Sequence, residues 1–150
     1  MTLIAFNSPF ESGSYSAVRD ARDTARPGRS RRLPGRILTG AGLALLPWLG
    51  YLAGTLPPAE AAAWVALDAL EAAALLTAGT RLLRADPRHR APALAAAVLL
   101  VADACLDLAT AAPGVERITA LAMAIGAELP LAALCAYLAS RPARAARDRA

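Results

Sequence analysis

The sequence predicts an all-α fold, namely a four-helix transmembrane bundle with short links between the helices and a disordered N-terminal arm. Hydrophobic residues make up 57% of the 150 residues. The mean hydropathy of +0.41 lies above that of typical soluble proteins. These apolar residues gather in four stretches, each about as long as the 20 residues that a helix needs to cross a bilayer. The alternation of apolar and polar residues that marks a half-buried strand does not appear.

The four predicted spans cover residues 37–56, 61–80, 91–112 and 118–139, within a transmembrane domain of residues 37–140. The links "PPAE", "RLLRADPRHR" and "PGVER" contain the proline and glycine residues that are common at helix ends. A soluble alanine-rich bundle would need a charged stripe along each helix, and these stretches lack one. We therefore expect the lipid bilayer to surround the protein.

The arginines predict how the chain is oriented. All sixteen basic residues are arginine, and fifteen of them stand before the first span, in the second link or after the fourth span. The first link has none, and the third has only Arg117. Because basic residues remain on the cytoplasmic side, this pattern predicts a multi-pass protein of the plasma (cell) membrane with both termini in the cytoplasm.

The two ends of the chain read as basic cytoplasmic segments. Residues 1–36 are rich in Ser, Gly, Pro and Arg, which predicts a flexible arm, and residues 141–150 form a basic tail. We favour a role for the arm in setting topology, with contact to anionic lipid head groups as the alternative. We expect no nucleic-acid partner. The arginine pair in "SRRLPGR" also fits an export signal, but the apolar run after it exceeds the usual 7–15 residues or so.

Five acidic residues stand inside the predicted spans, where no basic residue accompanies them: Asp68, Glu71, Asp103, Asp107 and Glu128. The first two are three residues apart and the next two are four apart, so each pair shares a helix face. Glu71, Asp103 and Glu128 lie about nine or ten residues from the outer end of their spans, or roughly 15 Å at the rise of an α-helix. This depth places them near the middle of the bilayer, with Asp68 and Asp107 about one turn closer to the exterior.

The cost of these acids predicts where they point. A charged Asp at a helix centre costs about 2.5–3.5 kcal/mol, whereas each Leu or Val returns only about 0.3–0.6 kcal/mol. Two charged aspartates in the third span therefore outweigh its aliphatic residues. The acidic faces should turn into the bundle, with the acids protonated or paired with a bound cation.

Two interpretations of the acids stay open. In the first, they form a cavity that binds a metal cation or exchanges protons, with Glu71, Asp103 and Glu128 at its core and Asp68 and Asp107 at its mouth. In the second, the protein is structural or regulatory, and protonated acids only link helices through hydrogen bonds worth about 1 kcal/mol each.

Other residues near the spans predict contacts and bends. Gly50 and Gly54 form a GxxxG pattern, a candidate face for helix contact and for a homo-oligomer. Pro130 lacks an N–H, so we expect a kink and an unpaired carbonyl at Gly126.

Three aromatic residues, Trp48, Tyr51 and Trp64, stand toward the outer ends of the first two spans. We favour a role as anchors at the membrane interface over a role as a lid above the acids.

The sequence offers little support for catalysis or for a cofactor other than a bound cation. His89 is the single histidine, and Cys105 and Cys135 are the two cysteines, which disfavours a zinc site. The cysteines differ in predicted depth by about ten residues, or about 15 Å, too far for a disulfide. We therefore lean against an enzyme.

The stretches "LDALEAAALLTAGTRLLR", "LLVADACLDLATA" and "AELPLAALCAYLA" resemble a family of uncharacterised four-span integral membrane proteins of actinobacteria, over roughly residues 60–140. That resemblance implies the membrane class without an activity. Acids buried in four helices are also similar to those of EXPERA-type proteins, which would imply binding or isomerisation of a small apolar ligand. The aromatic walls that such a pocket needs are scarce in the third and fourth spans.

Overall fold

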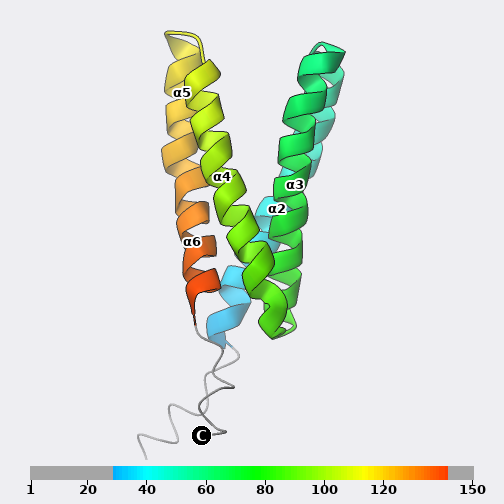
Figure 1. Ribbon diagram of the computed structural model, residues 1–150, viewed down its shortest axis with the longest axis vertical. Helices are drawn as coiled ribbons and strands as arrows, with labels where there is room; N and C mark the ends of the chain where they lie inside the picture. The colour runs from blue at the N-terminus through cyan, green and yellow to red at the C-terminus, as the bar shows by residue number, and fades with distance from the viewer. Residues whose placement is uncertain (1–28, 142–150) are drawn as a thin grey trace, which may run out of the picture. The chain divides into compact units, whose positions relative to one another are not determined.

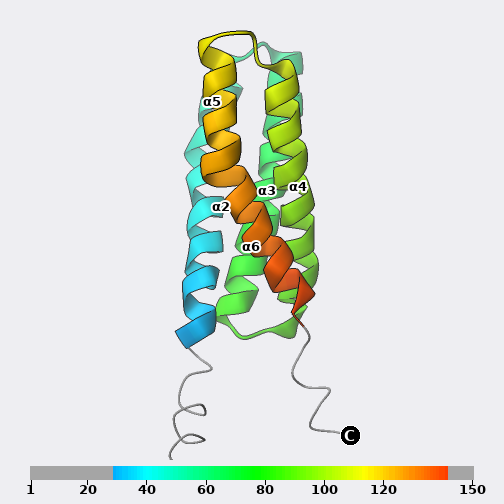
Figure 2. The ribbon, with the colours of Figure 1, turned by 90° about the vertical axis from the view of Figure 1, so that its left-hand side faces the viewer.

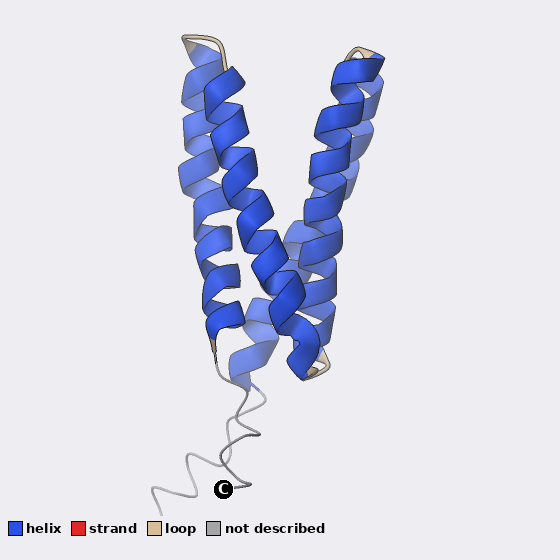
Figure 3. Cartoon of the chain, viewed as in Figure 1, coloured by secondary structure: helices blue, strands red, loops and turns tan. Residues whose placement is uncertain are grey.

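The computed structural model describes residues 29–141, and every regular element in that range is a helix (Figure 3). Four helical segments are long and apolar enough to cross a membrane, which confirms the predicted fold class: Arg32–Thr55, Ala61–Leu83, Pro87–Thr110 and Val115–Ser140. Residues 1–28 of the expected arm and residues 142–150 of the expected tail lie outside the described residues. Residues 29–36, which we assigned to the arm, belong instead to the first helix.

The helices follow one another along the chain with short links (Figure 1). In chain order they are α2 (Arg29–Thr55), α3 (Pro58–Leu83), the 3₁₀ turn η1 (Pro87–His89), α4 (Arg90–Thr110), α5 (Val115–Met123), the π turn η2 (Ala124–Glu128) and α6 (Leu129–Ser140). The fourth predicted span is thus built from α5, η2 and α6 as one continuous helical segment.

Local chemistry explains the links. Pro57 precedes α3 and Pro58 occupies its first turn, where a missing N–H costs nothing. The Asp86 carboxylate accepts a hydrogen bond of 2.9 Å from the Arg88 N–H and so starts η1. Between α4 and α5, Gly114 has φ of 104°, a conformation that side chains with a Cβ rarely adopt.

Three glycines bring α2 and α3 into close contact. A Cβ atom added to Gly79 would lie 2.5 Å from Thr39 Oγ1 and 2.9 Å from the Gly35 carbonyl oxygen. A Cβ atom at Gly42 would lie 2.8 Å from the Leu76 side chain. Residues without a side chain at these positions allow the two backbones to approach, as in many helix pairs within membranes.

The GxxxG pattern that the sequence suggested does not coincide with these three glycines. A Cβ added to Gly50 or Gly54 would meet no atom within 4 Å. Both glycines lie in the half of α2 nearer the α2–α3 link, whose surface is largely exposed. The pattern therefore makes no helix contact within the described chain, and a homo-oligomer through this face stays a prediction.

The apolar core occupies the end of the bundle near the α3–α4 link. It comprises Leu38, Leu75, Ala78, Leu82, Ala93, Ala96, Ala97, Leu100, Ala132, Cys135 and Leu138. Helix α6 runs beside the first part of α4 (Figures 1 and 2). The Arg90 Nε–H group donates a hydrogen bond of 2.8 Å to the Ala139 carbonyl, which joins the start of α4 to the end of α6.

Candidate functional site

The five acidic residues of the predicted spans come together beyond the apolar core. Asp68 and Glu71 lie on α3, Asp103 and Asp107 on α4, and Glu128 at the end of the π turn η2. They form two groups, Asp68–Glu71–Asp103 and Asp103–Asp107–Glu128, and within each group one carboxylate oxygen per residue lies within 4.8 Å of the others. Asp103 belongs to both groups. Asp103 and Asp107 thus face the acidic sides of α3 and η2, as the cost of exposing them to lipid predicted.

Three of these acids are almost fully removed from the surface. Glu71 is 1% exposed, Asp68 4% and Glu128 7%, whereas Asp103 and Asp107 are half-buried. The Glu71 Oε1 and Glu128 Oε2 atoms are buried without any hydrogen-bond partner. A buried polar atom without a partner costs about 1–3 kcal/mol, and more when it is charged. Each of the two acidic groups therefore contains one buried glutamate with an unsatisfied oxygen.

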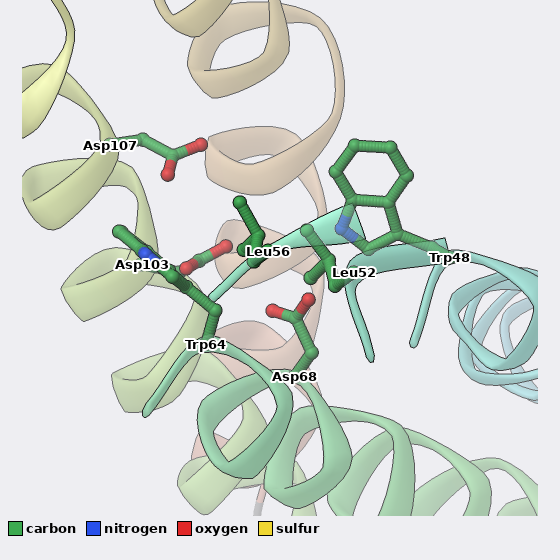
Figure 4. A pocket seen from close by; sticks show the side chains of 7 residues that line it. All are labelled: Trp48, Leu52, Leu56, Trp64, Asp68, Asp103 and Asp107. Carbon is green, nitrogen blue, oxygen red and sulfur yellow. The ribbon is translucent and has the colours of Figure 1, made fainter. Parts of the chain in front are cut away.

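A cavity of about 180 Å³ adjoins the acids (Figure 4). Its lining comes from three helices: Trp48, Leu52 and Leu56 of α2, Trp64 and Asp68 of α3, and Asp103 and Asp107 of α4. One water molecule takes about 30 Å³ in the liquid, so the cavity has room for several. Glu71 and Glu128 do not line it and lie in the adjacent buried layer.

Both tryptophans take part in this cavity. Trp48 and Trp64 line it from α2 and α3. Trp48 also stacks on Tyr51, with ring centroids 5.4 Å apart. We had favoured anchoring at the membrane interface for these residues. The two tryptophans lie beside the acids, and the anchoring role of the three aromatic residues stays a prediction.

The π turn places Glu128. Ala120, Ala124, Glu128 and Ala132 are each four residues apart, and all four are buried. In a regular α-helix such spacing would drift around the axis, but a π turn holds an additional residue and keeps the four side chains on one side. The Leu129 N–H group donates to the Ala124 carbonyl across this turn, just before Pro130. Gly126, whose carbonyl we expected to be unpaired, lies on the exposed side of the turn.

The other candidate ligands of the chain lie elsewhere. Cys105 and Cys135 are free thiols, one exposed and the other buried in the apolar core. His89 belongs to η1, in the link before α4, where its Nδ1 atom lies 2.7 Å from the Asp86 carbonyl oxygen. Between residues 37 and 80 and between 91 and 116 the sequence contains no basic residue that could neutralise the acids.

No family model matches the chain, and neither curated proteins nor solved structures give a match. The resemblances to actinobacterial four-span proteins and to EXPERA-type proteins stay predictions. The function is therefore argued from the acids and the cavity.

Proposed function

We propose that this chain is a multi-pass protein of the cell membrane whose acidic cavity binds cations, with protons competing for the same carboxylates. One observation carries this proposal. The Asp103 carboxylate lies within ligand-sharing distance of four other carboxylates: two on α3, one on its own helix α4 and one on η2.

Charge balance supports a cation over a purely structural role. Carboxylates removed from water need a base, a hydrogen-bond donor or a metal to compensate for the loss of hydration. The spans supply no base, and the Glu71 Oε1 and Glu128 Oε2 atoms have no donor. Acids retained only to link helices would be expected to have their oxygens hydrogen-bonded. Bound cations would supply the missing positive charge.

The size of the cavity disfavours the apolar-ligand alternative. Pockets for drug-sized ligands have volumes of about 300–1,000 Å³, and this cavity has about 180 Å³. An ion with a few water molecules suits that volume better than a sterol-like substrate.

Binding is tested by titrating the full chain in lipid nanodiscs with Ca²⁺, by equilibrium dialysis at pH 8 and at pH 5. We expect tighter binding at pH 8, because carboxylates must be deprotonated to act as ligands. Asp103→Asn should abolish binding. Glu116→Gln is the matched control, because Glu116 is an exposed acid outside the cluster. Its carboxylate accepts a hydrogen bond from the Ala112 N–H group. Equal binding by the wild type and by Asp103→Asn would refute the proposal.

The side from which cations enter follows from the arginines. The cavity lies toward the α2–α3 link, where Leu56 and Trp64 stand, and this link carries no arginine. With both termini in the cytoplasm, the cavity would face the exterior. In a chain with Cys105 and Cys135 replaced by alanine, a cysteine at Ala59 should react with an impermeant maleimide from outside, and a cysteine at Arg88 should not. The reverse pattern would overturn the orientation.

A further inference from the structure

We propose that the acidic site, which comprises the five carboxylates and the adjoining cavity, binds two divalent cations of about the size of Ca²⁺ side by side, with the Asp103 carboxylate as their shared ligand. This inference rests on the proposed function and specifies the number, class and arrangement of the ions.

The division of the acids into two groups points to two ions. Oxygen atoms bound to one Ca²⁺ lie 2.3–2.6 Å from it, so they can be at most about 5.2 Å apart. Each acidic group meets that limit, since its oxygens lie within 4.8 Å of one another. Among residues 29–141, no such group joins Asp68 or Glu71 to Asp107 or Glu128. An ion at either group takes ligands from three acids, whereas two ions take ligands from all five, and Asp103 alone belongs to both groups.

Each of the two acidic groups, and so each proposed ion position, contains one buried oxygen atom without a hydrogen-bond partner. The first contains the Glu71 Oε1 atom and the second the Glu128 Oε2 atom, both buried without a partner. Glu71 is 1% exposed and Glu128 7%, so bulk water does not hydrate either side chain well. An ion at one position alone would leave the buried oxygen of the other position without compensation. The two orphaned oxygens thus favour occupation of both positions together.

The net charge leads to the same number of ions. With all five carboxylates ionised and no base nearby, one divalent cation would leave a charge of −3 and two would leave −1. Carboxylate oxygen favours hard divalent ions such as Ca²⁺, Mg²⁺ and Mn²⁺. Mg²⁺ binds oxygen at 2.0–2.1 Å, so its ligand oxygens can be at most about 4.2 Å apart. This limit is stricter than the 4.8 Å within which the oxygens of each group lie. Ca²⁺ takes six to eight oxygens, and water in the adjacent cavity can complete its shell.

Mn²⁺ serves as the probe, because it is paramagnetic and accepts the same oxygen ligands. The full chain in nanodiscs is dialysed against Mn²⁺, and the bound metal is counted and examined by electron paramagnetic resonance. We expect two Mn²⁺ per chain with the spin coupling of a carboxylate-bridged pair, and displacement of both by Ca²⁺. Glu71→Gln should leave a single uncoupled ion at the second position, and Glu128→Gln a single ion at the first. Asp103→Asn should lose the coupled pair, while Glu116→Gln retains it.

The outcomes separate this inference from the proposed function. One ion per chain in the wild type, or two ions without spin coupling, would overturn the paired arrangement and leave the proposed function standing. Loss of one and the same ion in both Glu71→Gln and Glu128→Gln would also overturn it. If the wild type binds no Mn²⁺ or Ca²⁺, both ideas fail. Should Glu71→Gln not fold, Asp68→Asn removes a ligand from the same group and must give the same single uncoupled ion.

Discussion

The half of the bundle near the α3–α4 link and the half near the α2–α3 link are built from different materials. The first packs aliphatic side chains around Leu38 and Leu75, both fully buried. In this half, glycines allow the backbones of α2 and α3 to approach closely. The second has five carboxylates, two tryptophans and a cavity at the corresponding place. The first half buries apolar side chains against one another, whereas the second contains buried carboxylate oxygens without hydrogen-bond partners. The first half therefore stabilises the fold, and the second contains the site at which we propose that cations bind.

The largest effect on stability is expected from a single methyl group at the glycine contact. Gly79→Ala should destabilise the protein by about 1–3 kcal/mol, the usual cost of overpacking. Its Cβ would press on the backbone of Thr39, 2.7 Å from the nitrogen, which cannot turn aside as a side chain could. The measurement is the free energy of unfolding in detergent, by denaturant titration.

Gly54→Ala is the matched control for that change. It adds the same methyl group to α2 near the α2–α3 link, where no atom lies within 4 Å of the added Cβ. We expect it to be neutral or slightly stabilising, because Ala favours a helix by about 0.5–1 kcal/mol over Gly. Equal destabilisation by both changes would show that the stability of α2 does not depend on the glycine contact.

The sequence predicted most of this comparison at the level of helices. Hydropathy located the four spans, because a bilayer imposes both the length and the apolar character of a helix. The alternating direction of the spans then placed Glu71, Asp103 and Glu128 at one depth. In the structure Asp103 shares a group with Glu71 and another with Glu128.

The contacts inside the bundle could not be predicted from the same patterns. A GxxxG pattern identifies small residues but not the side of a helix that faces its neighbour, so Gly50 and Gly54 fit it as well as the glycines that do pack. Residues 29–36 read as an arm because they are polar, yet Arg is also a good helix former. Pro130 predicted a disturbed backbone, but its form, a π turn that keeps Glu128 inward, depends on packing against α4.

The π turn provides a test that is expected to affect only the acidic half. Pro130→Ala restores an N–H and removes the ring, which should allow an α-helical turn in place of η2 and shift Glu128 away from Asp103 and Asp107. Cation affinity should fall by about 10-fold, in the range seen when residues that orient metal ligands are changed. The stability of the cation-free protein should not decrease. An unchanged affinity would show that η2 does not position Glu128.

The smallest expected effect is a change in tryptophan fluorescence when Ca²⁺ binds. The chain has two tryptophans, and both line the cavity. Binding of Ca²⁺ should change their fluorescence, because charge and water next to the indole rings change. Trp48→Phe should retain the part of the signal that comes from Trp64, and Ca²⁺ affinity should stay within a few-fold of the wild type, because an indole ring offers no oxygen ligand to the ion. If Ca²⁺ binds and leaves the emission of the wild type unchanged, the bound ion does not lie in this cavity.

The most direct test of the difference between the two halves is the stability of Asp103→Leu, measured with and without Ca²⁺. In the wild type, Ca²⁺ at 100 times its dissociation constant should stabilise the fold by about 2.7 kcal/mol. In Asp103→Leu, the cation-free protein should be as stable as the wild type or more so, because a buried charge has been removed, and Ca²⁺ should have no effect. A loss of stability in Asp103→Leu, together with no response of the wild type to Ca²⁺, would contradict the cation site and identify the acids as links between helices.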